Sequence, residues 1–291
     1  MCFMAKRSNQ SSRFSVSARR KILTYIILGI GAFISLVPFF WMISTSLKSL
    51  GEAIGASFFP SSLHFENYVE AWRIADFSEF FVNSLLITLI TLSGQLTFSV
   101  LAAYAFARID FPGRDFIFSV MLSTMMIPAM VFTIPNFLTV TWLGRITPIP
   151  WINNWPALTI PFMGNIFSIF MLRQFFAQVP DELFDAAQID GAGHLRFLLQ
   201  VVLPLSKAPL MVIVVLSFIG TWNSLAWPML VTNTPDWRPI SVGLMNFVDE
   251  AGQMINLTMA GAFITIIPIL VIYFFTQKQF TESIARSGLK G

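Results

Sequence analysis

Long apolar stretches alternate with short polar connections along the chain. Six stretches contain no Asp, Glu, Lys or Arg, and they cover residues 22–47, 80–107, 116–144, 146–172, 208–235 and 251–277. Each exceeds the roughly 20 residues that an α-helix needs to cross about 30 Å of hydrocarbon. We expect the helical cores near residues 22–44, 82–106, 117–140, 157–172, 209–231 and 258–276. The pattern therefore predicts an all-α polytopic membrane protein with six transmembrane helices.

Composition supports this class. The 291 residues are 55% hydrophobic and only 11% charged, with a mean hydropathy of +0.71, whereas a soluble domain carries about 25% charged residues. A disordered chain and an ordinary cytosolic enzyme are thereby excluded. The single cysteine, Cys2, excludes an internal disulfide. Runs such as residues 212–216 are apolar on every side, which excludes the alternation of a membrane β-barrel.

The basic residues predict how the chain lies in the membrane. Residues 1–21 contain six basic residues and no acidic one, and the second, fourth and last connections of the six-helix reading are also basic. In total 14 basic residues fall on the side of the two termini and 4 on the opposite side. The positive-inside rule then predicts that both the N-terminus and the C-terminus are cytoplasmic. Nothing in the distribution resembles a groove for nucleic acid.

These features divide the chain into four expected segments. Residues 1–21 form a basic cytoplasmic segment, residues 22–79 hold the first transmembrane helix and an external segment, and residues 80–277 hold the remaining five helices. Residues 278–291 form a cytoplasmic tail. Within the five-helix core, the connection over residues 173–207 is the longest cytoplasmic one, and a loop of this length is usually functional.

The middle of this connection reads as a helix–turn–helix. Pro180 opens a helix whose first turn is acidic, as the positive N-terminal end of a helix favours. Gly191 and Gly193 then predict a turn. A second amphipathic run extends from Leu195 to Leu203 and ends at Pro204.

A family resemblance becomes specific at these positions. Asp185-Ala186-Ala187, Asp190-Gly191-Ala192 and Leu203-Pro204 resemble the EAA loop of permease subunits in ATP-binding-cassette (ABC) importers. In that family the loop forms short coupling helices that dock on a cytoplasmic ATPase subunit. The family's usual glutamate is aspartate at Asp185, which keeps the charge on a shorter side chain.

The resemblance covers nearly the whole chain and is closest to the second, smaller permease of maltose-type sugar importers. The segments that carry it are Pro38–Met42, Phe65–Tyr68, Ala102–Arg108, Trp222-Asn223, Trp227-Pro228 and Ser287–Gly291. It implies a type I ABC importer transmembrane fold that translocates a carbohydrate into the cytoplasm across a bacterial or archaeal plasma membrane. It also implies three partners besides the membrane lipid: a homologous second permease, a cytoplasmic ATPase dimer and an extracytoplasmic solute-binding protein.

The residues themselves indicate an external source of energy. All 15 acidic residues lie outside the six expected cores, and both histidines lie in connections, so no ion-coupling group of a secondary transporter is visible. The chain also lacks the Gly-x-x-x-x-Gly-Lys-Ser/Thr phosphate loop. We therefore expect no cofactor on this chain and ATP use by partner subunits. A passive channel or a secondary transporter for a neutral polar solute is the alternative; an intramembrane enzyme would need catalytic motifs that are absent.

Uncharged polar and aromatic residues within the spans are the candidates for a solute pathway. Amides bond sugar hydroxyls and aromatic rings stack on sugar faces, although such residues also join helices to one another. Helical spacing places Gly220, Asn223 and Trp227 on one face of the expected fifth span. The candidate pathway residues are Asn83, Asn136, Trp222, Asn223 and Trp227.

Overall fold

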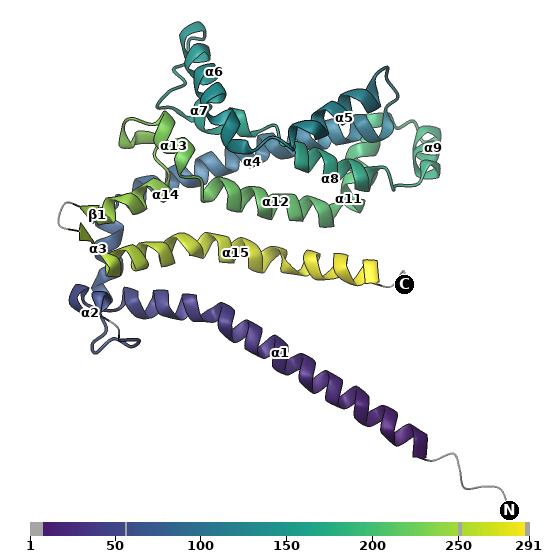
Figure 1. Cartoon of the computed structure of the whole chain (residues 1–291). Helices are drawn as coiled ribbons and strands as arrows, with labels where there is room; N and C mark the ends of the chain where they lie inside the picture. Colours follow the sequence, from purple (N-terminus) through teal and green to yellow (C-terminus); the bar gives the residue numbers. More distant parts are fainter. Residues whose placement is uncertain (1–7, 56, 250–251, 289–291) are drawn as a thin grey trace, which may run out of the picture. The chain divides into compact units, whose positions relative to one another are not determined.

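The structure is a computed structural model that describes residues 8–55, 57–249 and 252–288. These residues are helical almost throughout (Figure 1), with one pair of two-residue strands, β1 (Val248–Asp249) and β2 (Gly252–Gln253). The all-α prediction is confirmed. The ends of the expected terminal segments, residues 1–7 and 289–291, lie outside the described residues. The chain divides into two units: one of residues 1–71 and 251–263, the other of residues 72–250 and 264–291.

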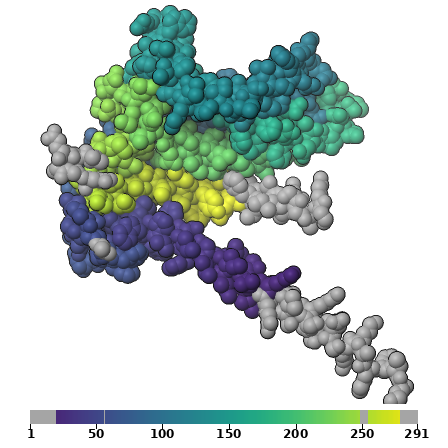
Figure 2. All heavy atoms as spheres, viewed as in Figure 1, coloured from purple at the N-terminus to yellow at the C-terminus, as the bar shows by residue number. Residues whose placement is uncertain are grey.

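The first unit contains helix α1 (Ser8–Ser46), the short α2 (Leu50–Ile54), most of α3 (Glu66–Ile74) and the beginning of α15 (Ile255–Gly288). The large apolar side chains of α1 are exposed from Ile22 to Trp41, and Figure 2 shows this helix, in purple, as a rod of side chains. An apolar surface of this kind is stable where lipid covers it.

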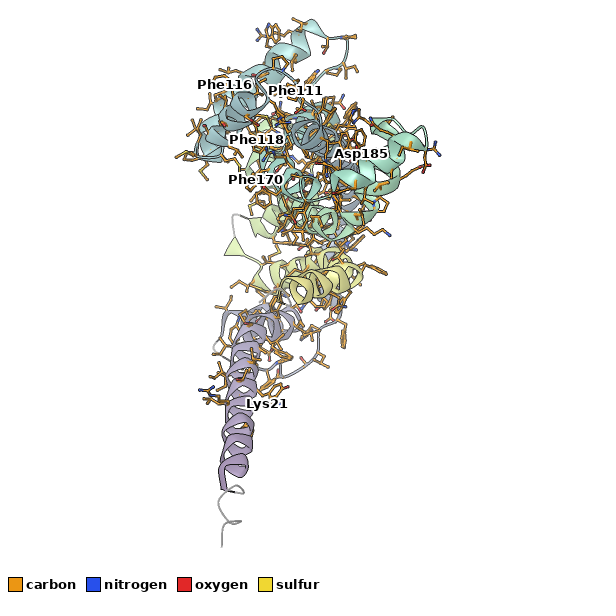
Figure 3. The ribbon with its side chains drawn as sticks, turned by 90° about the vertical axis from the view of Figure 1, so that its right-hand side faces the viewer. Lys21, Phe111, Phe116, Phe118, Phe170 and Asp185 are labelled. Atoms are coloured by element: carbon orange, nitrogen blue, oxygen red, sulfur yellow. The ribbon has the colours of Figure 1, made fainter. Side chains whose placement is uncertain are left out.

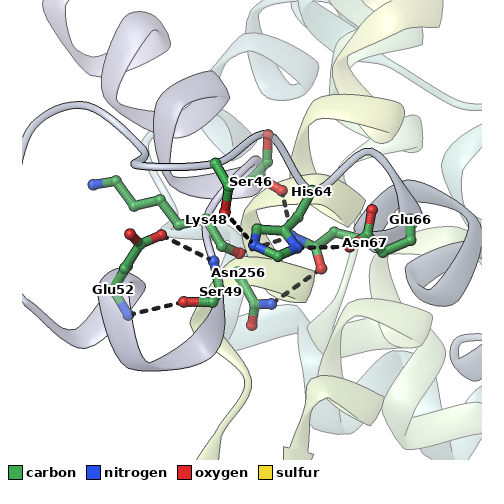
Figure 4. Close-up of polar contacts among 9 residues, drawn as sticks. Ser46, Lys48, Ser49, Glu52, His64, Glu66, Asn67 and Asn256 are labelled. Atoms are coloured by element: carbon green, nitrogen blue, oxygen red, sulfur yellow. Dashed lines mark hydrogen bonds and ion pairs between the residues drawn. The ribbon is translucent and has the colours of Figure 1, made fainter.

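A polar network holds the first unit together beyond the end of α1 (Figure 4). The side-chain nitrogen of Asn67 donates to the carbonyl oxygens of Ser46 at 2.8 Å and Lys48 at 2.9 Å, and its oxygen accepts from Asn256 at 3.3 Å. Three segments that are distant in sequence thus share one amide. Next to it, Ser49 and Glu52 form a capping box that starts α2.

The second unit is built around helix α4 (Phe77–Arg108), which packs along α8 (Ile166–Phe176) and α12 (Lys207–Trp222). Its main core gathers the buried Phe118, Leu172, Phe176, Phe197 and Ile213. A tight turn follows α4, with Gly113 at φ 81° leading into α5 (Arg114–Thr124).

Within the part of the chain that the structure describes, three helices are long and apolar enough to cross a membrane, over residues 20–46, 77–108 and 255–277. The number rises to six only if each of three bent pairs is counted as one span: residues 114–124 with 129–146, residues 155–162 with 166–176, and residues 194–205 with 207–222. The bends measure 97°, 40° and 81°. Hydropathy thus predicted where the membrane-spanning segments lie, but it did not predict where their helices are interrupted.

The expected continuous third core over residues 117–140 is wrong. The helix ends at Thr124 and resumes in η1 (Ala129–Phe132) and α6 (Thr133–Ile146). Pro128 stands at the interruption; it has no N–H for a helical bond and constrains the residue before it. The fourth span also has two parts, with α7 (Trp155–Thr159) and η2 (Ile160–Phe162) preceding α8.

The expected fifth core over residues 209–231 is interrupted as well. Helix α12 ends at Trp222, and a separate α13 (Ala226–Val231) follows. Pro228 cannot donate to the Ser224 carbonyl four residues earlier, and this carbonyl instead accepts from the Ser241 hydroxyl at 2.5 Å. Three short elements then precede β1: η4 (Pro235–Trp237), α14 (Ile240–Gly243) and η5 (Leu244–Phe247).

Candidate functional site

The predicted helix–turn–helix is present between α8 and α12. Helix α9 (Asp181–Ile189) begins after Pro180 with two acidic residues in its first turn. After the turn, α10 (His194–Phe197) continues through a π-helical turn, η3 (Leu198–Val202), into α11 (Leu203–Leu205). The second helix is therefore longer than the predicted Leu195–Leu203 run. Pro204 lies within it rather than ending it.

The turn between the two helices requires Gly191. Its φ is +75°, a left-handed conformation that costs other residues about 1–2 kcal/mol. The N–H of Gly191 donates to the Gln188 carbonyl at 2.9 Å, and that of Ala192 donates to the Ala187 carbonyl at 2.8 Å. These two bonds form a Schellman motif. The end of α9 is thereby fixed in one geometry.

The residues that carry the resemblance lie mostly on the free side of this loop. Asp185, Ala186, Asp190 and Gly191 are exposed, and Figure 3 shows Asp185 on α9. Ala187 instead faces inward and packs with Phe184 against the main core. Of the last pair, Leu203 is half-buried and Pro204 is exposed.

Arg108, the last residue of α4, anchors the beginning of the loop. Its side chain is 10% exposed. Its Nε donates to the carbonyl oxygen of Phe176 at 3.0 Å, and one terminal nitrogen donates to the carbonyl of Val179. The other terminal nitrogen pairs with the carboxylate of Asp181. One guanidinium thus satisfies carbonyl groups at the end of α8 and contacts the first residue of α9.

An aromatic cluster holds the second helix of the loop against the same end of α4. The Tyr104 hydroxyl lies 3.0 Å from Nδ1 of His194. The His194 ring stacks on Phe184 with centroids 4.8 Å apart, and Phe184 meets Phe197 edge-on at 5.0 Å. Phe197 is fully buried. Both helices of the loop are therefore attached to α4, about one turn apart.

A cavity of about 320 Å³ lies among α4, η2, α8, α12 and α13. Its polar walls include Gln95, whose amide nitrogen donates to the hydroxyls of Ser168 at 2.9 Å and Ser217 at 2.7 Å. No lining residue of this cavity carries a charge in the described structure. Its lining residues include Ser84, Ile87, Gln95, Asn165, Ser168, Ser217, Thr221, Ser224 and Trp227.

The five candidate pathway residues do not form one group. Trp227 lines the cavity, and its indole N–H donates to the Ala157 carbonyl at 2.8 Å. Trp222 is 1% exposed, and its indole donates to the Thr265 carbonyl at 3.0 Å. Asn83 donates to the carbonyls of Asp236 and Arg238. Asn136 is half-buried on α6, and Asn223 is exposed at the end of α12. Of the five candidates, Trp227 alone belongs to the cavity lining.

The single helical face expected for Gly220, Asn223 and Trp227 is wrong, because α12 stops before Asn223. Gly220 and Trp227 line the cavity from separate helices. Sequence reasoning also gave Arg108 no role of its own. The sequence signal for Arg108 was its place directly after a charge-free span. The positive-inside rule explains a basic residue at that place equally well.

Among the described residues, no group of three or more His, Cys, Asp or Glu is placed to hold a metal ion. The site thus consists of a loop attached to α4 and an uncharged cavity within the spans.

Comparisons with known proteins agree with this architecture. Residues 95–280 match the family described as binding-protein-dependent transport system inner membrane component. The diacetylchitobiose uptake permease NgcG of Streptomyces coelicolor is 28% identical over 96% of this chain and 93% of its own. The sn-glycerol-3-phosphate transport permease UgpE of Brucella abortus is 30% identical over 91% and 96%.

Solved structures show the same fold. A chain of a bacterial ABC transporter involved in the import of the acidic polysaccharide alginate superposes with a TM-score of 0.77 at 26% identity, covering 96% of this chain and 99% of that one. The fold is therefore that of a type I ABC importer permease. Because the family match spans more than half of the sequence, the chain belongs to the inner membrane components of binding-protein-dependent transport systems, among the sugar ABC transporter permeases.

Proposed function

We propose that this chain is the permease subunit of an ATP-driven importer that carries a carbohydrate or related polyhydroxylated solute into the cytoplasm. It works with a homologous second permease, two cytoplasmic ATPases and an extracytoplasmic solute-binding protein. Both termini are cytoplasmic in the bacterial or archaeal plasma membrane. The chain binds no cofactor, and ATP is used by the partner subunits.

The loop over residues 180–204 carries the proposal. One side of α9 is free and presents Asp185, Ala186 and Asp190, small or acidic residues that let another surface approach closely. The beginning of α9 is attached to α4 by the contact of Arg108 with Asp181, and its other side is attached through the cluster around His194. A displacement of the free side of α9 is therefore transmitted to the membrane-spanning helices through side-chain contacts as well as through the backbone. This arrangement suits the coupling of an ATPase to the membrane helices.

The uncharged cavity supports a solute with hydroxyl groups. Gln95, Ser168 and Ser217 supply amide and hydroxyl groups, and Trp227 supplies an aromatic ring. Amides and hydroxyls bond sugar hydroxyls. In the proposed cycle, closure of the ATPases around ATP moves the loop and opens the pathway to the solute-binding protein. Hydrolysis then returns the pathway to the cytoplasmic side.

The replacement Gly191→Pro tests the coupling. Proline cannot adopt a φ of +75° and would also remove the N–H that donates to Gln188. We expect ATP-dependent uptake to fall to background while ATP hydrolysis continues, because the loop no longer transmits closure. The measurement compares uptake and hydrolysis by the complex in proteoliposomes, and normal uptake would contradict the assignment.

Gly193→Ala is the matched control. Gly193 has a φ of −81°, and a Cβ added there meets no atom within 4 Å. This variant should insert, hydrolyse ATP and transport like the wild type. Purification of the tagged chain from native membranes provides an independent test, because it should retain an ATPase and a second permease. Recovery of the chain alone would favour a passive channel.

A further inference from the structure

A stripe of polar side chains runs along one face of α4. Ser84, Thr88, Thr91, Gln95 and Ser99 are spaced by three or four residues, as neighbours on one helix face are. All five are buried, with at most 3% of their surface exposed. From the first to the last residue the stripe rises about 22 Å at 1.5 Å per residue, most of the thickness of a hydrocarbon core.

Three hydroxyls of this stripe have no hydrogen-bond partner. The oxygens of Thr88, Thr91 and Ser99 are buried and unbonded in the structure. Burial of an unpaired hydroxyl is unfavourable. Several helical threonines avoid this cost by donating to the carbonyl four residues earlier, as Thr97 does to Ser93 at 2.8 Å and Thr139 to Pro135 at 2.8 Å. Outside the stripe, the hydroxyl of Thr45 in α1 is also buried without a partner in the described structure.

The stripe is continuous with the cavity. Ser84 and Gln95, on either side of Thr88 and Thr91, both line it. Gln95 also bonds α4 to two neighbouring helices, through Ser168 on α8 and Ser217 on α12. Any separation of α8 or α12 from α4 would therefore release these groups together with the buried hydroxyls.

We propose that this face of α4 is the wall of the translocation pathway to which the solute's hydroxyl groups bond in succession. The inference rests on the proposed function and names the class of solute: an uncharged, polyhydroxylated compound. The stripe contains only hydroxyl and amide groups, and these match sugar hydroxyls as donors and acceptors. The unpaired hydroxyls acquire water or solute as partners when the neighbouring helices move away.

Joining of helices is a weaker explanation for these residues. A polar residue that joins transmembrane helices does so through a hydrogen bond. Two of the five fit that description: Gln95 donates to α8 and α12, and the Ser84 hydroxyl accepts from the N–H of Ile240 in α14 at 2.7 Å. Thr88, Thr91 and Ser99 lack such a bond in the described structure. A role in which the partner arrives later in the cycle accounts for these three positions.

Water access to the stripe can be measured by cysteine labelling of the assembled transporter. The chain has one cysteine, Cys2, so Cys2→Ser provides a background for Thr88→Cys and Thr91→Cys. The probe is a small hydroxyethyl methanethiosulfonate, which reacts with thiolate and thus requires a hydrated thiol. Thr97→Cys is the matched control, because Thr97 lies on the same helix but on its exposed side. Labelling of this chain is followed by mass spectrometry in native membrane vesicles, without nucleotide and after trapping with ATP and vanadate.

We expect Thr88→Cys and Thr91→Cys to react about tenfold faster in one of the two states than in the other, and faster than Thr97→Cys. Equal labelling in both states, still above Thr97→Cys, would support the wall and contradict ATP-driven opening. Labelling no faster than Thr97→Cys in either state would contradict the proposal that this face of α4 lines the pathway. It would not affect the proposed coupling to the ATPase, which the Gly191→Pro experiment tests separately. Ser99→Cys gives a third position if either variant fails to insert.

Discussion

Through its side chain, Arg108 connects three helices at the beginning of the loop. It ends α4, bonds carbonyls at the end of α8 and pairs with the start of α9. These contacts differ in how much free energy they contribute to the docking of the loop. Asp181 is 89% exposed, and exposed ion pairs contribute about 0–1 kcal/mol. Hydrogen bonds from a charged, mostly buried group contribute about 1.5–3 kcal/mol each, so the carbonyl bonds matter more than the ion pair.

Replacement of Arg108 should consequently disturb the loop strongly. We expect Arg108→Ala to lower ATP-dependent uptake about tenfold or more, since each 1.4 kcal/mol of lost docking energy corresponds to a factor of ten. The ratio of solute transported to ATP hydrolysed in proteoliposomes is the measurement. Asp181→Asn and Arg114→Ala are the controls: the first removes only the exposed ion pair, and the second removes a nearby cation that pairs with Asp110. An equal loss in the three variants would disprove the special role of Arg108.

At the scale of elements, side-chain hydrogen bonds stabilise the five-residue helix α2. Ser49 and Glu52 cap its start, and Glu52 also accepts from the hydroxyl of Ser61. That hydrogen bond from Ser61 is the main reason that the pKa of Glu52 lies below its ordinary value of 4.5. The folded segment therefore prefers the ionised carboxylate.

The lowered pKa gives this segment a defined pH dependence. A depressed carboxylate pKa stabilises the fold above 4.5, and the contribution is lost as the pH falls below 4.5 towards the folded value. We expect residues 49–55 and 57–61 to lose hydrogen-exchange protection as the pH is lowered from about 6 to about 3.5. Glu52→Gln should show reduced protection at both values. Unchanged protection in wild type across this range would refute the role of the carboxylate.

Helical spans are also the scale at which sequence prediction succeeded and failed. The charge-free stretches marked the three continuous spans and at least part of each bent pair, because a charge in lipid is costly wherever it lies. They did not mark the interruptions at Pro128 and after Trp222, because a proline changes backbone bonding without changing hydropathy. The turn at Gly191 was predictable because a left-handed turn depends on a local sequence signature, a glycine just after the end of a helix. The roles of Arg108 and Thr88 depend on packing between distant segments, which local patterns do not encode.

At the scale of the whole molecule, the family assignment and the charge distribution lead to one orientation. Of the basic residues, 14 fall on the side of the two termini and 4 on the other, a bias that predicts cytoplasmic termini. We expect a green fluorescent protein fused after Gly291 to fluoresce and alkaline phosphatase at the same place to be inactive. The pattern should reverse for fusions in the segment around residue 60. The opposite pattern would exclude the proposed docking of the loop on a cytoplasmic ATPase.

The π turn between Leu198 and Val202 has a consequence for the permitted length of the chain. A π turn accommodates one residue more than the α-helix on either side of it. Loss of one residue there would leave a regular α-helix and keep the rotational phase of both flanking segments. A deletion elsewhere in the loop would instead rotate everything beyond it by about 100°. The helix from His194 to Leu205 therefore tolerates a change of one residue in length at this turn and at no neighbouring position.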